Sequence, residues 1–362
     1  MTGSVQSRLD LGADAAELTR ALVDIPSVSE SEQQIADAVE RAVTALPRLH
    51  SDRIGNVVIA RFDVNAAHTV VLAGHLDTVP IADNVPAQVE GDTIRGCGSS
   101  DMKSGVAVAL RAAYLVGSGE LDPNVSLTWL FYDCEEIAAE RNGLRRLAHD
   151  RPELMRGDLA VLFEPTAGLI EGGCQGTMRV RARVTGRRAH SARSWLGSNA
   201  IHGAAPLLQR LADYPGRIVD VDGLEYREGL NAVAIEGGVA GNVVPDECLV
   251  TVNFRFAPDR TEADALDHVA GVLDGFPIEL LDSAPGARPG MTAPIAQRLA
   301  RAVGGTPRGK LGWTDVSRFA ALGVPALNFG PGDPNLAHTR EEWVSAQAVR
   351  AAEAALVRFL SG

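Results

Sequence analysis

The spacing of apolar residues along the chain predicts alternating helices and strands in its first half. Apolar side chains recur at helical intervals over 14–24 and 32–45. Short continuous apolar runs, typical of buried strands, lie at 69–74, 125–132 and 158–163. A further apolar helix is expected directly after the segment DMKSG at 101–105. This alternation predicts an α/β fold, with a mixed, mainly parallel sheet that helices cover on both faces.

The pattern changes at about residue 178. Strands of alternating polarity follow in MRVRARVTG, LNAVAIEGGVAG and CLVTVNFRFAP, with helices near 198–212 and 261–273, and a Gly/Pro-rich segment lies at 283–291. Helix and strand alternation then returns, with a helix at 292–303, a strand at 325–329 and a last helix from 345. We therefore expect a catalytic domain in two parts, 1–177 and 289–362, interrupted by an inserted α+β domain over 178–288.

Composition and charge narrow the class of protein. A chain of 362 residues, 46% apolar and 22% charged, is typical of a soluble globular protein with two domains. No apolar run approaches the roughly 20 residues that span a bilayer, and the N-terminus carries no apolar signal segment. Four cysteines lie outside any CxxC spacing, which favours reduced thiols, so we expect a cytoplasmic protein.

The net charge bears on the partners. Lys and Arg number 34 against 46 Asp and Glu, a net charge of -12, which disfavours nucleic acid and membrane surfaces as partners. An anionic small-molecule substrate would then need local arginines.

The stretch LAGHLDTVP at 72–80 ends a predicted buried strand with His75 and Asp77. Residues i and i+2 of an extended segment share a face, so His75 could bind a metal while Asp77 holds its ring. Taken alone, such a triplet at a strand end is more often a hydrogen-bonded turn.

Further acidic and imidazole groups follow at corresponding places, each at a predicted strand end or helix start. They are Asp101, Glu135, Glu136, Glu164 and His338. Taken singly, each is better explained as a helix cap, a solvated strand end or a loop histidine. Together, two histidines and several carboxylates form a nitrogen and oxygen ligand set suited to Zn²⁺, Co²⁺ or Mn²⁺. Two ions are compatible with this set, because a carboxylate that spans both would offset their repulsion.

The adjacent acids Glu135 and Glu136 suggest a division of roles. Neighbouring strand residues point to opposite faces, so both reach one site only if the backbone turns there. One carboxylate could then bind a metal while the other takes a proton from a water molecule whose pKa the ion has lowered to about 7. The alternative interpretation is an acidic loop without chemistry.

Seven motifs, spread from residue 75 to 342, resemble the dinuclear zinc aminoacylase and carboxypeptidase family. They are HLDTVP, GCGSSDMKSG, DCEE, FEPT, GRRAHSARSWLGSNAI, GGVAGNVVPDE and GPGDPNLAHTREE. The resemblance implies a zinc exopeptidase-like fold with an inserted lid and dimerisation domain. It also implies a homodimer with a small-molecule substrate and two Zn²⁺ per subunit, for which Co²⁺ may substitute.

Within that family the motifs are most similar to members that remove a succinyl group from an amino acid. A related deacylase or dipeptidase, such as an acetylornithine deacetylase or an aminoacylase, remains an alternative. A more remote alternative is a non-catalytic protein that binds a metal or ligand on the same fold.

The resemblance also implies roles for single residues. His75, Asp101 and Glu164 would hold one zinc, and Asp101, Glu136 and His338 the other, with Asp101 bridging. Asp77 would orient His75, and Glu135 would be the general base and then the acid. His190 would stabilise the oxyanion from across a dimer interface, and a cis peptide is implied between Asp101 and Met102.

The substrate contacts are the residues least determined by the sequence. Asn242 resembles a contact from the inserted domain, and Arg179 and Arg255 are candidates for holding carboxylates, because a guanidinium pairs with them bidentately. Thr314 and Asn335 complete the expected set. The chain departs from the family pattern in DMKSG for the frequent DMKG, in Cys97, and in Ile137-Ala138 after the paired acids.

Overall fold

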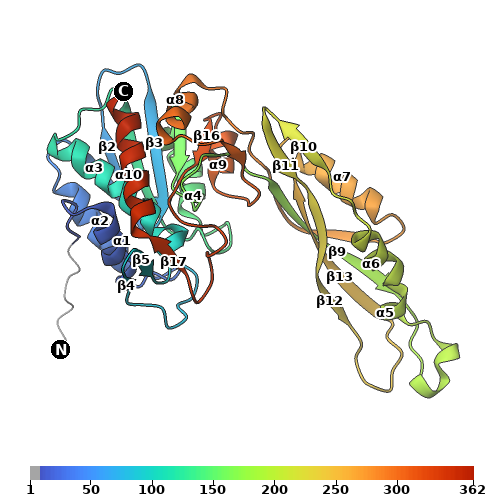
Figure 1. The fold of residues 1–362 in the computed structure, drawn as a ribbon. Helices are drawn as coiled ribbons and strands as arrows, with labels where there is room; N and C mark the ends of the chain where they lie inside the picture. Colours follow the sequence, from blue (N-terminus) through green and yellow to red (C-terminus); the bar gives the residue numbers. More distant parts are fainter. Residues whose placement is uncertain (1–8) are drawn as a thin grey trace. The chain divides into compact units, whose positions relative to one another are not determined.

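The computed structural model describes residues 9–362, which form two compact units (Figure 1). The first unit contains the described residues up to Gly173, with Pro289–Arg308 and Thr314–Gly362; the second contains Cys174–Arg288 and Gly309–Trp313. The short segment Gly309–Trp313 belongs with the second unit because Lys310 O accepts the Gln175 N–H at 3.1 Å, and Trp313 Nε1 donates to Pro285 O at 3.1 Å.

An eight-stranded sheet forms the centre of the first unit. Its order is β1 (His50–Ile54), β2 (Val57–Phe62), β6 (Ser126–Tyr132), β3 (Thr69–His75), β7 (Leu159–Leu162), β16 (Ala326–Asn328), β8 (Glu171–Gly172) and β15 (Arg308–Gly309). The central strands β6, β3, β7 and β16 are parallel, whereas β1, β2 and β8 pair antiparallel with their neighbours. The expected mixed, mainly parallel sheet is confirmed.

Helices cover both faces of this sheet. Alternate residues of each strand point to opposite faces, and the central strands are buried along nearly their whole length, so both faces must be covered. Val70 and Leu72 of β3 join a core with one group of helices. That group is α1 (Ala15–Val23), α2 (Gln33–Thr44), α3 (Ser104–Ser118), α8 (Pro294–Val303) and α10 (Ala346–Ser361). On the other face, α9 (Val316–Ala321) packs on β7 and β16 and contacts α4 (Gly143–Asp150).

Shorter elements complete the first unit. They are the small sheet of β4 (Gln88–Glu90), β5 (Thr93–Arg95) and β17 (Trp343–Ser345), and the helical turns η1 (Ser99–Lys103) and η2 (Pro152–Met155). No helix within residues 9–362 is both long enough and apolar enough to cross a membrane.

The second unit is a four-stranded antiparallel sheet with helices on one face. Its order is β12 (Gly229–Gly237), β13 (Glu247–Phe256), β9 (Gly176–Thr185) and β14 (Ile278–Ala284). The helices are α5 (Ala200–Gly203), α6 (Ala205–Ala212) and α7 (Glu262–Val272), and η3 (Ser191–Leu196) and the hairpin β10 (Ile218–Val221) and β11 (Leu224–Arg227) complete the unit. Along β9, Met178, Val180 and Ala182 enter the core, whereas the arginines between them lie on the open face.

Candidate metal centre

The carboxyl ends of three parallel strands bring acidic and imidazole groups to one edge of the first unit's sheet. His75 is the last residue of β3, Glu135 and Glu136 follow β6, and Glu164 follows β7. Parallel strands that lie side by side end at the same edge, where ligands bind in sheets of this kind. His75 is almost fully buried there, and its backbone N–H donates to the Met102 sulfur at 3.3 Å.

Asp101 lies between His75 and His338. Its Oδ1 is 3.2 Å from Nε2 of His75, and its Oδ2 is 3.5 Å from Nε2 of His338. His338 Nε2 is also 2.9 Å from Oε1 of Glu136. Potential ligand atoms of His75, Asp101 and Glu136 all lie within 4.8 Å of one another. The two oxygens of one carboxylate therefore face two separate imidazoles, which is the arrangement a bridging ligand requires.

The charges at this centre suit cations. Burial alone would lower the pKa of His75, but Asp101 and Asp77 outweigh it and raise that pKa well above its usual value. Asp101 and Glu136 raise the pKa of His338 to about 10. Burial opposes ionisation of Asp101, yet the two imidazoles hold its pKa well below its usual range. Without a metal ion, both imidazoles are therefore in the charged, doubly protonated form, and a divalent cation that binds them would displace one proton from each.

Asp77 connects His75 to the paired acids. Nδ1 of His75 lies 3.0 Å from the backbone oxygen of Asp77 and 3.5 Å from its Oδ1. The Asp77 carboxylate also accepts the backbone N–H groups of Glu135 and Glu136, each at 3.0 Å, and the Ser29 hydroxyl at 2.7 Å. A single buried carboxylate thus fixes the imidazole and the segment that carries both glutamates.

The backbone turns directly before the paired acids. Cys134 has a positive φ of 57°, which ends the extended run of β6 and frees Glu135 and Glu136 from alternating across a strand. Glu136 then approaches His338, while Glu135 is partly buried beside the group. Burial, followed by the charge of Glu164, raises the pKa of Glu135 well above its usual value, and His75 opposes the shift. Glu135 is therefore the acid best placed to exchange a proton.

The structure also shows supporting residues that the sequence analysis missed. Glu32 is fully buried, and its Oε1 accepts the backbone N–H of Cys134 at 3.2 Å, which fixes the turn before the paired acids. Asp315 is fully buried, accepts the Asn142 amide at 2.7 Å, and adds to the raised pKa of Glu135. Glu32 lies in a polar helix start 102 residues before Cys134, so local pattern gave no sign of the contact.

Four expected site residues lie in the second unit, and the structure brings them together in pairs. His190 is exposed, its Nδ1 accepts the Ala192 N–H at 3.0 Å, and the adjacent Ser191 N–H donates to Asn242 O at 2.9 Å. Arg179 and Arg255 share the open face of β9 and β13.

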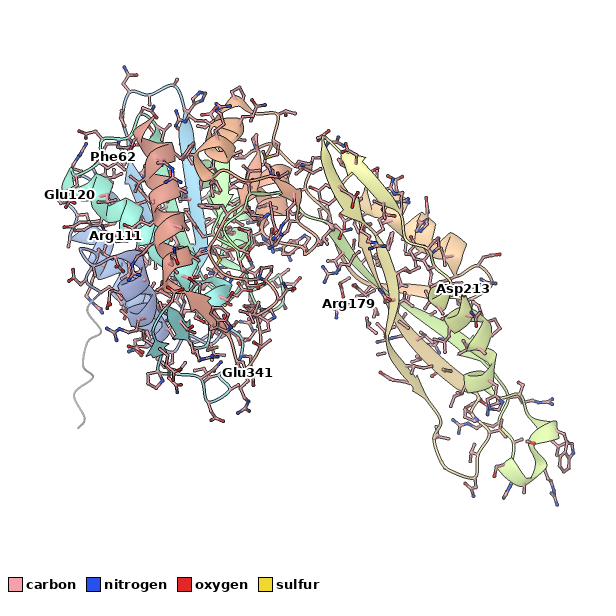
Figure 2. All side chains as sticks on the ribbon, viewed as in Figure 1. Phe62, Arg111, Glu120, Arg179, Asp213 and Glu341 are labelled. Carbon is pink, nitrogen blue, oxygen red and sulfur yellow. The ribbon has the colours of Figure 1, made fainter. Side chains whose placement is uncertain are left out.

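The two arginines differ in their surroundings. Arg179 is exposed (Figure 2), and its Nε donates to Asp282 at 2.6 Å. Arg255 is half-buried, and burial, with the nearby Arg179, lowers its pKa.

The two remaining candidates lie in the first unit and differ in exposure. Thr314 is buried, and its hydroxyl donates to Asn328 Oδ1 at 2.9 Å, at the end of β16. Asn335 is exposed, and its backbone and side-chain N–H groups both donate to Asp333 at 2.8 Å. The peptide between Asp101 and Met102 is cis, as the family resemblance implies.

Comparisons with known proteins identify the family of this chain. The model of peptidase family M20/M25/M40 matches residues 71–362. A Mycobacterium tuberculosis protein described as a candidate succinyl-diaminopimelate desuccinylase is 55% identical over 98% of this chain and its own full length. The succinyl-diaminopimelate desuccinylase of Corynebacterium glutamicum is 48% identical over the full length of both chains.

A solved structure shares the fold. The crystal structure of a tripeptidase from Staphylococcus aureus superposes with a TM-score of 0.79 at 20% identity, covering 98% of each chain. The family model spans both the centre at the sheet edge and the second unit, and the bacterial relatives match nearly the whole chain. This chain therefore belongs to peptidase family M20/M25/M40.

Proposed function

We propose that this protein is a metal-dependent amide hydrolase that cleaves N-succinyl-LL-diaminopimelate to succinate and LL-diaminopimelate. The observation that carries the hydrolase assignment is Asp101, whose two oxygens face two histidines while Glu135 lies close by. The choice of substrate rests on the relatives of 55% and 48% identity that are described as desuccinylases.

The residues at the sheet edge fit a pair of divalent cations. Asp101 and Glu136 lie beside the two imidazoles. Burial, together with repulsion from Glu164 and Glu136, raises the pKa of Glu135. Two cations would offset that negative charge. His75, Asp101 and Glu164 would hold one Zn²⁺, and Asp101, Glu136 and His338 the other; Co²⁺ would substitute. When bound, the ions would polarise the amide carbonyl and lower the pKa of a water molecule.

Glu135 would move the proton in this reaction. The oxygen of water bonds to the amide carbonyl carbon, and Glu135 accepts the proton that the water loses. The C–N bond then breaks, and Glu135 returns the proton to the nitrogen of the leaving amine. A carboxyl whose pKa is raised well above its usual value can serve both as base and as acid, and Asp77 holds the Glu135 backbone in place for this exchange.

The second unit would supply contacts to the rest of the substrate. His190, contributed by a second copy in a homodimer, would donate to the negative charge that develops on the carbonyl oxygen. Arg179 and Arg255 would pair with substrate carboxylates, and Asn242, Thr314 and Asn335 would add hydrogen bonds. The edge strand β12 leaves Val233 and Ile235 more than half exposed, a surface of the kind that pairs with another copy.

The proposal also assigns the protein to the cytoplasm and to a biosynthetic pathway. Its four cysteines are buried thiols, which accords with a cytoplasmic enzyme. Diaminopimelate is a precursor of lysine and of the cell wall, so the reaction would belong to that biosynthesis.

The experiment offers two substrates to metal-stripped protein reconstituted with zinc: N-succinyl-LL-diaminopimelate and N-acetylornithine. We expect zinc-dependent cleavage of the succinylated substrate and little of the acetylated one. Cleavage of N-acetylornithine alone would support the assignment as a metal-dependent hydrolase but contradict the proposed substrate. Failure to cleave either, with zinc demonstrably bound, would overturn the proposed function.

A further inference from the structure

Glu342 is a buried carboxylate that is not among the expected metal ligands, yet it binds the backbone beside one of them. Only 2% of it is exposed. Its Oε1 accepts the N–H groups of Ser100 at 2.8 Å and Asp101 at 2.9 Å, and its Oε2 accepts the Gly98 N–H at 2.9 Å. Three charge-assisted hydrogen bonds from one side chain to one short segment are a strong restraint, because each is stronger than a neutral one.

The main chain of Glu342 is anchored as well. Its carbonyl oxygen accepts the Gly96 N–H at 3.0 Å, and its own N–H donates to Thr339 O at 3.3 Å. The next residues, Trp343–Ser345, form β17 and pair with β5 directly before Gly96. Glu342 therefore joins the segment that carries His338 to the segment that carries Asp101.

This link acts where regular structure ends. Asp101 has φ -122° and ψ 98° inside the turn η1, so no helical or strand pattern sets the direction of its side chain. Its two oxygens nevertheless face His75 and His338. The Asp101 N–H and the two donors before it are the groups that Glu342 holds, so the position of the Asp101 main chain depends on this contact.

We propose that Glu342 is a positioning residue for the metal centre, one that holds Gly98–Asp101 so that the Asp101 carboxylate presents one oxygen to each metal position. This inference rests on the proposed function only in assuming that the centre binds divalent metal. Residues that orient metal ligands typically change metal affinity or activity 10–100-fold when they are altered. The Glu342 carboxylate holds the main chain of Gly98–Asp101, so its effect on the metal positions passes through Asp101.

The alternative is that Glu342 only stabilises the fold. The two roles differ in what Glu342→Gln changes. The amide keeps the size of the side chain and one oxygen acceptor, but its NH₂ group would face an N–H donor. A purely structural role would lower the melting temperature and leave zinc affinity and turnover of the folded protein unchanged. A positioning role would weaken zinc binding in protein that is still folded.

The matched control is Glu341→Gln. Glu341 is the preceding residue in the chain and carries the same charge, but its side chain is exposed (Figure 2). Glu342→Asp keeps the charge and withdraws the carboxylate by one methylene, so it tests reach separately from charge. Burial raises the pKa of Glu342 to about 7, so the measurements are made at pH 8, where the carboxylate is ionised.

The experiment measures zinc affinity by competition with a chromogenic chelator, and kcat and KM with N-succinyl-LL-diaminopimelate. For Glu342→Gln we expect zinc affinity and kcat to fall about 10–100-fold with little change in KM, and Glu341→Gln to match the parent. Folded Glu342→Gln with parental zinc affinity would overturn the proposal, even if its melting temperature fell. Zinc affinity needs no substrate, so failure of this inference is distinct from failure of the proposed substrate.

A second measurement uses the unaltered chain and does not depend on a variant folding. In metal-free protein the amides of Ser100 and Asp101 should already be protected from hydrogen exchange, because Glu342 holds them before metal binds. Rapid exchange of both amides that slows only when zinc is added would overturn the proposal, since the metal would then be ordering the segment.

Discussion

The two histidines of the metal centre are held in contrasting ways. His75 ends a central strand, its side chain is 1% exposed, and Asp77 lies against its ring. His338 lies in the loop between β16 and β17, has a positive φ of 61°, and its side chain is 52% exposed. The sheet itself places the first ligand, whereas the second lies in a loop held by contacts such as the Glu342 N–H donating to Thr339 O. Regular structure thus positions one histidine of the centre, and specific loop hydrogen bonds position the other.

The largest expected effect is on turnover, and it distinguishes proton transfer by Glu135 from metal binding by its neighbours at the end of the strands. Glu135→Gln should lower kcat about 10³-fold while zinc remains bound, because the amide cannot accept the proton. Steady-state kinetics and zinc content measure both. Glu140→Gln, an exposed acid in the same loop, is the control and should behave as the parent. Near-normal turnover by zinc-loaded Glu135→Gln would rule out the role given to Glu135.

The second prediction concerns the protons that the two histidines lose when zinc binds. Below its raised pKa each histidine is protonated, and that of His338 is about 10, so zinc binding at pH 7 must expel a proton from both rings. About two protons should be released, and apparent zinc affinity should rise with pH. Calorimetry in buffers of different ionisation enthalpy gives the number of protons released.

The loop histidine can be removed to check that count. His338→Gln should release about one proton fewer, because only His75 remains to be deprotonated. Zinc binding to the parent protein at pH 7 without proton release would contradict the charge state described for both rings.

The smallest effect tests the contrast in burial directly. In metal-free protein, His75→Ala would leave the buried Asp77 and Asp101 without their imidazole, and should cost about 3 kcal/mol of unfolding free energy. His338→Ala removes a half-exposed side chain and should cost less than about 1 kcal/mol. Urea unfolding at pH 7 measures both. Equal losses would show that the two ligands are equally embedded.

Much of the first unit follows from local pattern. The apolar runs at 69–74, 125–132 and 158–163 correspond to β3, β6 and β7, because buried parallel strands need apolar side chains on both faces. The order of these strands, and the edge at which they end, bring His75 near the paired acids. Asp101 and His338 were expected from motifs, and their distances from His75 and Glu136 required the folded chain.

Other features could not be predicted from the sequence. β14 at Ile278–Ala284 was missed because IELLDSA mixes apolar and acidic residues beside a Gly/Pro-rich segment. The hairpin of β1 and β2 was not predicted either. Glu342 lies within a recognised motif, but its partners are about 240 residues earlier, and no local spacing encodes such a contact.

The division of the first unit along the chain has a consequence for its synthesis. The helix α10, which packs on α1 and α3, is translated after the whole second unit. On the ribosome, the parts of α1 and α3 that α10 covers therefore stay exposed while most of the second unit, which is nearly continuous in sequence, is already complete. The nascent chain would hold an unfinished first unit for much of its translation, and a chaperone that binds exposed apolar helices would find its target there.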